Sequence, residues 1–198
     1  MLPDGTPGMT FGRVHDKLGF RLLRNQEIFF ENCRVPVEWR MGPEGKGFPA
    51  VRASIGSDGI LNACRALGVS RGAFETVVDF CKQRVACGAP IIEHEVIASQ
   101  LADMYIALYA MRSMVWQVAW AMDHPPTDRK LVPAAMTFCC DEAIKITSRA
   151  AEIPHGLGIM REAPFEKFMR DAFSIKHLDG GSNLRRIRIG KLLEADIF

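Results

Sequence analysis

The chain has 198 residues, of which 48% are hydrophobic and 24% are charged, and its net charge is +2. This composition excludes an intrinsically disordered, collagen-like or low-complexity chain. Acidic and basic residues nearly balance, so we do not expect a general nucleic-acid binder. The length is sufficient to bury a hydrophobic core without disulfides or a structural metal.

The first 41 residues are interrupted by glycine, proline and asparagine and contain only short β-prone runs. The strongest run is Glu27–Glu31, while Met9–Phe11 and Arg21–Leu23 are weaker. Two or three such strands do not make a self-sufficient sheet. We therefore interpret residues 1–41 as the remnant of a larger β domain and residues 42–48 as a hinge loop.

The remaining residues, 49–198, have a helical hydrophobic pattern divided by proline and glycine turns. We expect helices over about residues 49–85, 93–123, 127–153, 163–177 and 182–195. Thr127 or Asp128 is expected to cap the third of these. The predicted fold class is mainly α, an antiparallel helical bundle preceded by a short β remnant.

An apolar stretch from Met104 to Met122 is nearly long enough to span a membrane. It carries Arg112 near its middle, where a charge is expensive in lipid, so we expect no membrane span. The alternative is a helix packed in a bundle or at an oligomer interface. Exposed apolar side chains along it would be too large a patch for a soluble monomer, which predicts a homodimer or homotetramer; we expect this stripe to contain Met104, Ile106, Leu108, Met111, Trp116 and Trp120.

Six cysteines form no C-x-x-C pair, and no histidine has the spacing of a metal site. We therefore expect no metal. Ten methionines and the lack of a signal peptide favour free, mostly buried thiols in a reducing compartment. The expected localisation is cytoplasmic, or the mitochondrial matrix in a eukaryote.

The stretch Asp179–Asn183 is the strongest candidate site. Gly180 and Gly181 allow a close backbone approach, and Ser182 and Asn183 stand at the start of a helix, where phosphate or carboxylate is favoured. The plainer alternative is an Asp-capped helix with a glycine turn. Similarly, Arg84 near the end of the first long helix suits either the helix dipole or a bound phosphate or carboxylate.

Five stretches, in the same order along the chain, resemble the C-terminal half of the acyl-CoA dehydrogenase family of flavoproteins: Lys17–Gly19, Phe29–Pro36, Gly42–Phe48, Gln100–Met104 and Pro164–Ala172. The resemblance covers about half of a family member, from the end of the middle β domain through the C-terminal bundle. It implies FAD, an acyl-CoA substrate dehydrogenated between Cα and Cβ, an electron-accepting flavoprotein partner and a homodimer or homotetramer. It also implies that another subunit or segment supplies the missing N-terminal half.

The catalytic base is implied by position. In the short- and medium-chain members it is the Glu of a Tyr-Glu-Gly-Thr stretch, which matches Leu178–Gly181 here and makes Asp179 the base. In the isovaleryl and long-chain members the base lies on the first long helix, where the matching residue is Asp58. Both are one methylene shorter than glutamate, and Asp179 is preferred because the Gly-Gly turn agrees with it.

The cofactor contacts carry over with departures. Arg84 matches an arginine that reaches the flavin cofactor of the neighbouring subunit, and Gly156, Ser182 and Asn183 match further FAD contacts. Glu152 stands where the family usually has Gln, and an acid near a diphosphate is unfavourable. Two alternatives stay open: a relative that uses Asp as base, such as the nitroalkane-oxidising or the phosphotransferase-fused branch, and a non-catalytic bundle that serves as an oligomerisation scaffold.

Overall fold

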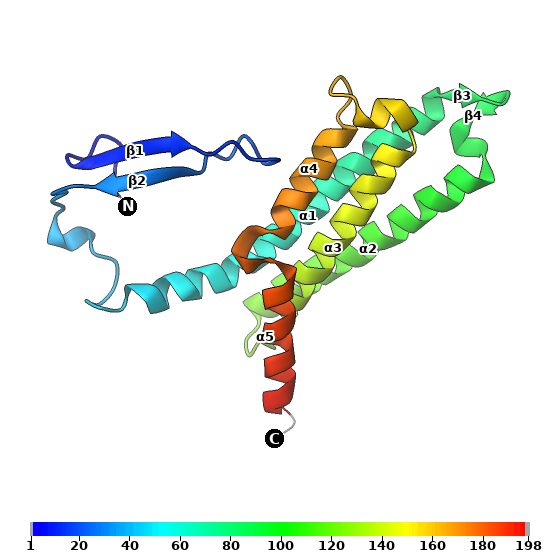
Figure 1. Ribbon diagram of the computed structural model, residues 1–198. Coiled ribbons are helices and arrows are strands. Elements are labelled where there is room, and N and C mark those ends of the chain that lie inside the picture. Colours follow the sequence, from blue (N-terminus) through cyan, green and yellow to red (C-terminus); the bar gives the residue numbers. More distant parts are fainter. Residues whose placement is uncertain (1, 197–198) are drawn as a thin grey trace.

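The computed structural model describes the backbone of residues 2–196 and, within them, the side chains of all but residues 50, 52–58 and 196. Most of these residues are helical, which confirms the mainly α fold class (Figure 1). The α-helices are α1 (Gly47–Gln83), α2 (Glu95–Asp123), α3 (Leu131–Glu152), α4 (Phe165–Lys176) and α5 (Gly181–Asp196). Short 3-10 helices are η1 (Val37–Trp39), η2 (Ile91–Glu93), η3 (His155–Ile159) and η4 (Leu178–Gly180).

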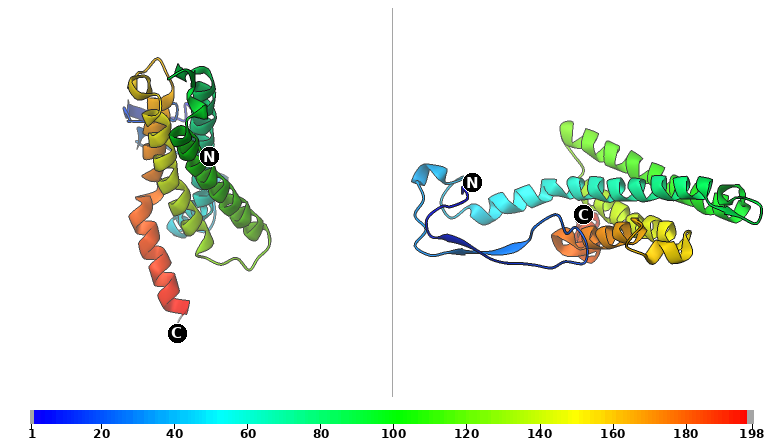
Figure 2. Two further views of the ribbon diagram at one scale, coloured as in Figure 1. Left: turned by 90° about the vertical axis from the view of Figure 1, so that its right-hand side faces the viewer. Right: turned by 90° about the horizontal axis from the view of Figure 1, so that it is seen from above.

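An antiparallel hairpin of β1 (Met9–Val14) and β2 (Gln26–Phe30) precedes the helices. Figures 1 and 2 show it beside the bundle rather than within it. Its apolar side chains are about half exposed, as two strands alone have little to pack against; they include Phe11, Ile28, Phe29 and Phe30. The third predicted run, Arg21–Leu23, is not a strand. It belongs to a turn in which the Leu23 N–H donates to the Phe20 carbonyl at 3.1 Å.

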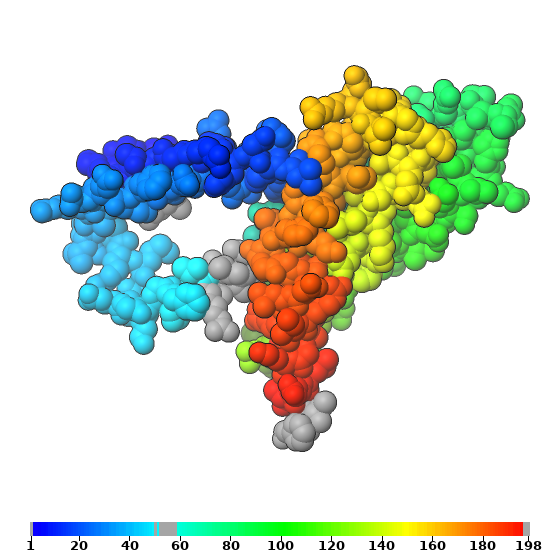
Figure 3. Space-filling view, in the orientation of Figure 1, coloured from blue at the N-terminus to red at the C-terminus, as the bar shows by residue number. Residues whose placement is uncertain are grey.

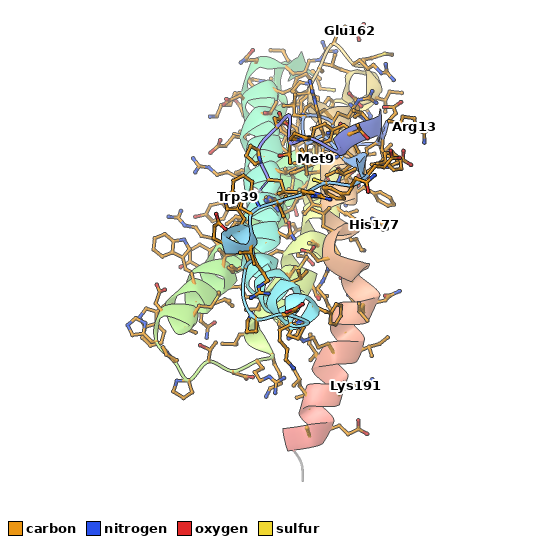
Figure 4. All side chains as sticks on the ribbon, turned by 90° about the vertical axis from the view of Figure 1, so that its left-hand side faces the viewer. Met9, Arg13, Trp39, Glu162, His177 and Lys191 are labelled. Atoms are coloured by element: carbon orange, nitrogen blue, oxygen red, sulfur yellow. The ribbon has the colours of Figure 1, made fainter. Side chains whose placement is uncertain are left out.

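The segment between the two strands contacts α4. A guanidinium N–H of Arg170 donates to the carbonyl oxygen of Leu18 at 2.7 Å. Figure 3 shows this N-terminal segment meeting α4, while the rest of the hairpin extends away from the helices. In Figure 4, Met9 and Arg13 mark the hairpin and Trp39 marks the 3-10 helix that follows it. The N-terminal part is thus fixed to the bundle near residues 18–20.

The core is centred on α3, which packs against α1, α2, α4 and α5. Small side chains allow α1 and α3 to approach closely; those fully buried include Ala63, Ala66, Ala73, Ala135, Cys139, Ala143 and Ala150. Larger side chains such as Val77, Met111, Ile146 and Ile175 fill the remaining space. Each buried side chain of this size contributes about 1.5–3 kcal/mol of transfer free energy.

The second helix, α2, has two apolar faces. Met104, Leu108 and Met111 are at most 9% exposed and face the core, so the predicted exposed stripe was wrong for these three residues. Ile106, Trp116 and Trp120 are more than 60% exposed, as is Tyr109 on the same face. Within the described part of the chain, no helix combines the length and apolarity that a membrane crossing requires.

The cysteine thiols are all unpaired, as predicted, but fewer of them are buried than expected. Cys81, Cys139 and Cys140 are buried, whereas Cys64 and Cys87 are exposed. No cluster of potential metal ligands occurs among the described residues. A short hairpin of β3 (Val85–Ala86) and β4 (Ala89–Pro90) carries Cys87 at its turn.

Candidate active site

Asp179 lies at the junction between α4 and α5, in the short helix η4. Its backbone has φ 51° and ψ 44°, in the left-handed region, and Gly180 and Gly181 follow with φ of 87° and 73°. An aspartate tolerates this conformation better than most residues, and the glycines adopt it without steric cost. Figure 4 labels His177 just before this turn and Lys191 near the end of α5. The turn leaves Asp179 exposed at the surface of the bundle.

A buried amide holds the Asp179 carboxylate. The Nδ2 group of Asn62, on α1, donates a hydrogen bond to Oδ2 of Asp179. Asn62 is only 2% exposed, and its own Oδ1 accepts from Nη1 of Arg65 at 2.5 Å. Asp58 lies one helical turn before Asn62 on α1, although its side chain is outside the described residues. The two candidate bases therefore belong to elements that pack together.

Ser182 has a different environment from the one expected of a ligand contact. It is 5% exposed, its hydroxyl donates to Oδ1 of Asp141 at 3.2 Å, and it accepts from Nη2 of Arg185 at 3.1 Å. Asn183, the next residue, is exposed. The Ser182 hydroxyl therefore anchors the first turn of α5 to α3, and Asn183 is the accessible residue of the pair.

Arg185 fixes the backbone on the N-terminal side of Asp179. Its guanidinium is 6% exposed and donates to the carbonyl oxygens of Leu178 at 3.1 Å and Lys176 at 3.3 Å. Burial lowers the pKa of Arg185, an effect that the nearby Asp141 partly opposes. This role of Arg185 depends on backbone carbonyls that the turn leaves without helical partners.

Asp141 joins three helices. It accepts from Lys176 of α4 at 2.9 Å and from Arg186 of α5, in addition to Ser182. Burial raises the pKa of its carboxyl, but the hydrogen bonds from Lys176 and Arg186 outweigh this and leave the pKa below its usual value. Asp141 is therefore a charged anchor of the element that carries Asp179.

A second group of the predicted residues lies at the C-terminal end of α1, away from Asn62. Arg84 and Gly156 line one open pocket of about 670 Å³, together with His94, His155 and Cys87. The remaining lining is apolar, and the lining includes no acidic side chain. At the rise of an α-helix, Arg84 and Asn62 are about 33 Å apart along α1. Figure 1 places the β3–β4 hairpin and the α4–α5 junction at different ends of the bundle.

Glu152 lines a neighbouring pocket of about 720 Å³ rather than the pocket of Arg84. Its carboxylate pairs with Arg149 at 3.4 Å, and Gln100 lines the same pocket. His155, with φ 53°, contributes to both pockets. The carboxylate of Glu152, which would repel a diphosphate, therefore lines a different pocket from Arg84 and is paired with Arg149.

Comparison with known proteins identifies the family of the chain. A family model described as the acyl-CoA dehydrogenase C-terminal domain matches residues 45–193. The chain belongs to the acyl-CoA dehydrogenase family. The family that the sequence resemblance predicted is thereby confirmed.

Relatives of this acyl-CoA dehydrogenase family chain match almost all of it. It is 33% identical over 196 residues to human mitochondrial short-chain specific acyl-CoA dehydrogenase, covering 98% of this chain and 48% of that protein. It is 35% identical over 188 residues to an acyl-CoA dehydrogenase of Bacillus subtilis, covering 95% and 50%. The structure of butyryl-CoA dehydrogenase from Megasphaera elsdenii superposes with a TM-score of 0.91 at 32% identity, covering 97% and 50%. The chain spans about half the length of the curated relatives it matches.

Proposed function

We propose that this chain is the C-terminal part, or a split subunit, of an FAD-dependent acyl-CoA dehydrogenase that introduces a double bond between Cα and Cβ of an acyl-CoA thioester. The observation that carries the proposal is the Asp179 carboxylate, held at a glycine turn before α5 by a buried amide. Abstraction of a proton from Cα requires a carboxylate held at a fixed position next to that carbon. The short-chain and butyryl-CoA names of the relatives favour a short acyl chain.

The pocket of Arg84 fits the diphosphate of FAD by its chemistry. Arg84 has a fork geometry suited to phosphate oxygens, and His155 adds a polar group to a lining that has no acidic side chain. Asn183, which is exposed at the start of α5 beside the Asp179 turn, is the candidate FAD contact at that second location. When bound, FAD supplies the acceptor for the hydride that leaves Cβ. Arg84 lies far along α1 from Asn62 and Asp179. This separation agrees with the family pattern, in which the residue at the position of Arg84 contacts the cofactor of a neighbouring subunit.

Asp179 takes the Cα proton in this scheme. The Cα–H bond breaks and an O–H bond forms on the carboxylate. The electron pair of the Cα–H bond becomes the second bond between Cα and Cβ, and the Cβ–H bond breaks as the hydride leaves for the acceptor that bound FAD would supply. Aspartate reaches about 1.5 Å less far than glutamate, so the acyl chain has to approach the α4–α5 turn more closely than it would approach a glutamate. The presence of aspartate at position 179 also supports a second candidate function, that of a nitroalkane-oxidising relative, because that branch of the family uses Asp as the base.

Two surfaces support additional protein partners. The half-exposed Phe11, Ile28, Phe29 and Phe30 of the hairpin fit further strands of a β domain supplied by another segment or subunit. The exposed face of α2 fits assembly into a homodimer or homotetramer. An electron-accepting flavoprotein would reoxidise the cofactor, and we propose a cytoplasmic or mitochondrial-matrix enzyme.

The test compares Asp179→Asn with Asp58→Asn in the FAD-loaded protein, with the partner that supplies the flavin domain where the chain needs one. Asp179→Asn keeps the shape and removes the basicity, so turnover of butyryl-CoA should fall by a factor on the order of a hundred or more. The FAD absorbance should barely change. Full activity in Asp179→Asn with loss in Asp58→Asn would move the base to α1.

Two further measurements separate the alternatives. Turnover of nitroalkanes without turnover of acyl-CoA would favour the nitroalkane-oxidising relative. Failure of the chain and of every reconstituted complex to take up FAD would leave the scaffold role. Cys87 lines the Arg84 pocket, so FAD binding should also protect it from a maleimide, a readout that does not depend on activity.

A further inference from the structure

Asn62 is a buried polar side chain on a mostly apolar face of α1. It is 2% exposed and lies beside Ala63 and Ala66, which are fully buried. A buried amide without partners costs several kcal/mol, so its position requires that its hydrogen bonds be made. Among the described residues, the hydrogen bonds of Asn62 go to Asp179 and Arg65 and none goes to α3. The hydrogen-bond partners of Asn62 therefore indicate what this side chain does.

Those partners determine how the amide is oriented. Arg65 can only donate, and an ionised carboxylate can only accept. The carbonyl oxygen of Asn62 must therefore face Arg65, and its NH₂ group must face Asp179. Both hydrogen bonds in the structure have this orientation. The reverse orientation would place two oxygens against each other and two donors against each other. Arg65 thus enforces the orientation in which Asn62 donates to Asp179.

We infer that Asn62 is a positioning residue for Asp179, and this rests on the proposed function of Asp179 as the base. Asn62 engages Oδ2, while Oδ1 has no hydrogen-bond partner in the part of the chain that the structure describes. One oxygen is therefore tethered and the other is available to the substrate. Because Asp179 is exposed, its side chain would otherwise sample several rotamers. A fixed carboxylate oxygen avoids that loss of alignment.

The test uses Asn62→Leu, which has similar volume and no donor, in the FAD-loaded protein. We expect kcat with butyryl-CoA to fall by about ten- to a hundredfold, with KM and FAD content nearly unchanged, because misplacement of about 1 Å costs up to this much. The primary isotope effect for Cα-deuterated substrate should rise as proton abstraction becomes slower. In the Asp179→Asn background the same substitution should cause no further loss.

Ser70→Ala is the matched control. Ser70 is fully buried on the same helix but bonds only the carbonyl of Ala66, at 2.7 Å, so its loss should lower stability and leave kcat unchanged. Arg65→Met is a second variant at an exposed position, where folding is not at risk, and it should lower kcat severalfold. A 15N spectrum of the chain should also show the Asn62 side-chain signals shifting in Asp179→Ala.

The outcomes are distinguishable. Wild-type kcat in both Asn62→Leu and Arg65→Met, together with an inactive Asp179→Asn, would overturn the role of Asn62 and leave the proposed base intact. Full activity in Asp179→Asn would overturn the base and, with it, the positioning role. A parallel loss of kcat in Ser70→Ala and Asn62→Leu would show a merely structural effect and would also overturn the inference.

Discussion

The carboxylate of Asp171 accepts a hydrogen bond from the backbone N–H of Phe20 at 2.6 Å, although the two residues are 151 positions apart in the sequence. Asp171 is 7% exposed and also accepts from Lys167 at 2.5 Å. A side chain on Gly19 would overlap the carbonyl group of Arg170, so only glycine fits this approach. Two of the family-like stretches, Lys17–Gly19 and Pro164–Ala172, are therefore the two sides of one contact.

Replacing Asp171 by Ala should release the N-terminal segment from α4. The loss of a nearly buried hydrogen bond to a charged group costs about 2 kcal/mol locally, which corresponds to a roughly thirtyfold rise in local opening. Hydrogen exchange at the Phe20 amide should accelerate by that factor. Asp16→Ala is the control, because Asp16 pairs with Arg21 at the exposed surface and should leave the Phe20 amide protected. Equal exchange in both variants would contradict the assigned contact.

The helices were predictable because their hydrophobic periodicity is local and continuous. The start of α3 was less predictable, and the expected cap by Thr127 or Asp128 was wrong. The helix begins at Leu131 with Lys130 as its N-cap and no side-chain cap, while Asp128 accepts from the Lys130 N–H at 2.9 Å in the turn before the helix. The contacts that build the site have no local signal. An asparagine in α1 gives no indication that it will meet Asp179, because that pairing depends on how α1 packs against the α4–α5 turn.

The same limit explains the errors on α2. Its spacing shows two apolar faces, and no local rule decides which one faces the core. The family resemblance also predicted cofactor contacts for Arg84, Glu152 and Ser182, and for Arg84 and Ser182 the position at a helix end agreed with it. Glu152 belongs to a different pocket and the Ser182 hydroxyl is used within the protein. Cavities and hydrogen-bond partners are properties of the packed chain, not of the segment.

The thiols should differ sharply in reactivity. Burial raises the pKa of Cys139 to about 12 and that of Cys140 to about 11, so at pH 8 about one thiol in a thousand or fewer is ionised at either position. Cys87 is exposed at the β3–β4 turn. Titration with Ellman's reagent at pH 8 should therefore label Cys87 rapidly in the native protein and all six thiols only in denaturant. Rapid native labelling of Cys139 would contradict the packing of α3.

Stability should depend on acid through Asp141. Its pKa is lower in the folded protein than the unfolded value of about 3.9. Its ion pairs therefore stabilise the fold fully above pH 3.9, and this contribution is lost as the pH falls through the folded pKa. Asp141→Asn should cost about 1–2 kcal/mol at pH 7, because its partners Lys176 and Arg186 are partly exposed.

Urea unfolding of the wild type and of Asp141→Asn between about pH 7 and pH 3 checks this, since the difference should shrink toward the acid end. Asp79→Asn is the control: Asp79 pairs with Lys82 at 3.5 Å on the surface, and its loss should have little effect at either pH. A difference that is independent of pH would show that Asp141 acts through its shape and not through its charge.

The exposed face of α2 should determine the oligomeric state. Tyr105, Ile106, Tyr109, Trp116 and Trp120 are between 59% and 67% exposed and recur at helical spacing on the side opposite the core. A contiguous apolar surface with two tryptophans is favourable to bury against a second copy. The wild-type chain should therefore be a dimer or tetramer at micromolar concentration. Ile106→Glu combined with Trp116→Glu should shift it toward monomer, because each glutamate would have to be desolvated in the contact.

Leu22→Glu is the matched control, since Leu22 is 98% exposed on the N-terminal segment and lies far from this face in the sequence. Sedimentation velocity of the three proteins gives the answer. A wild-type monomer, or an equal shift in Leu22→Glu, would show that this face does not hold the copies together.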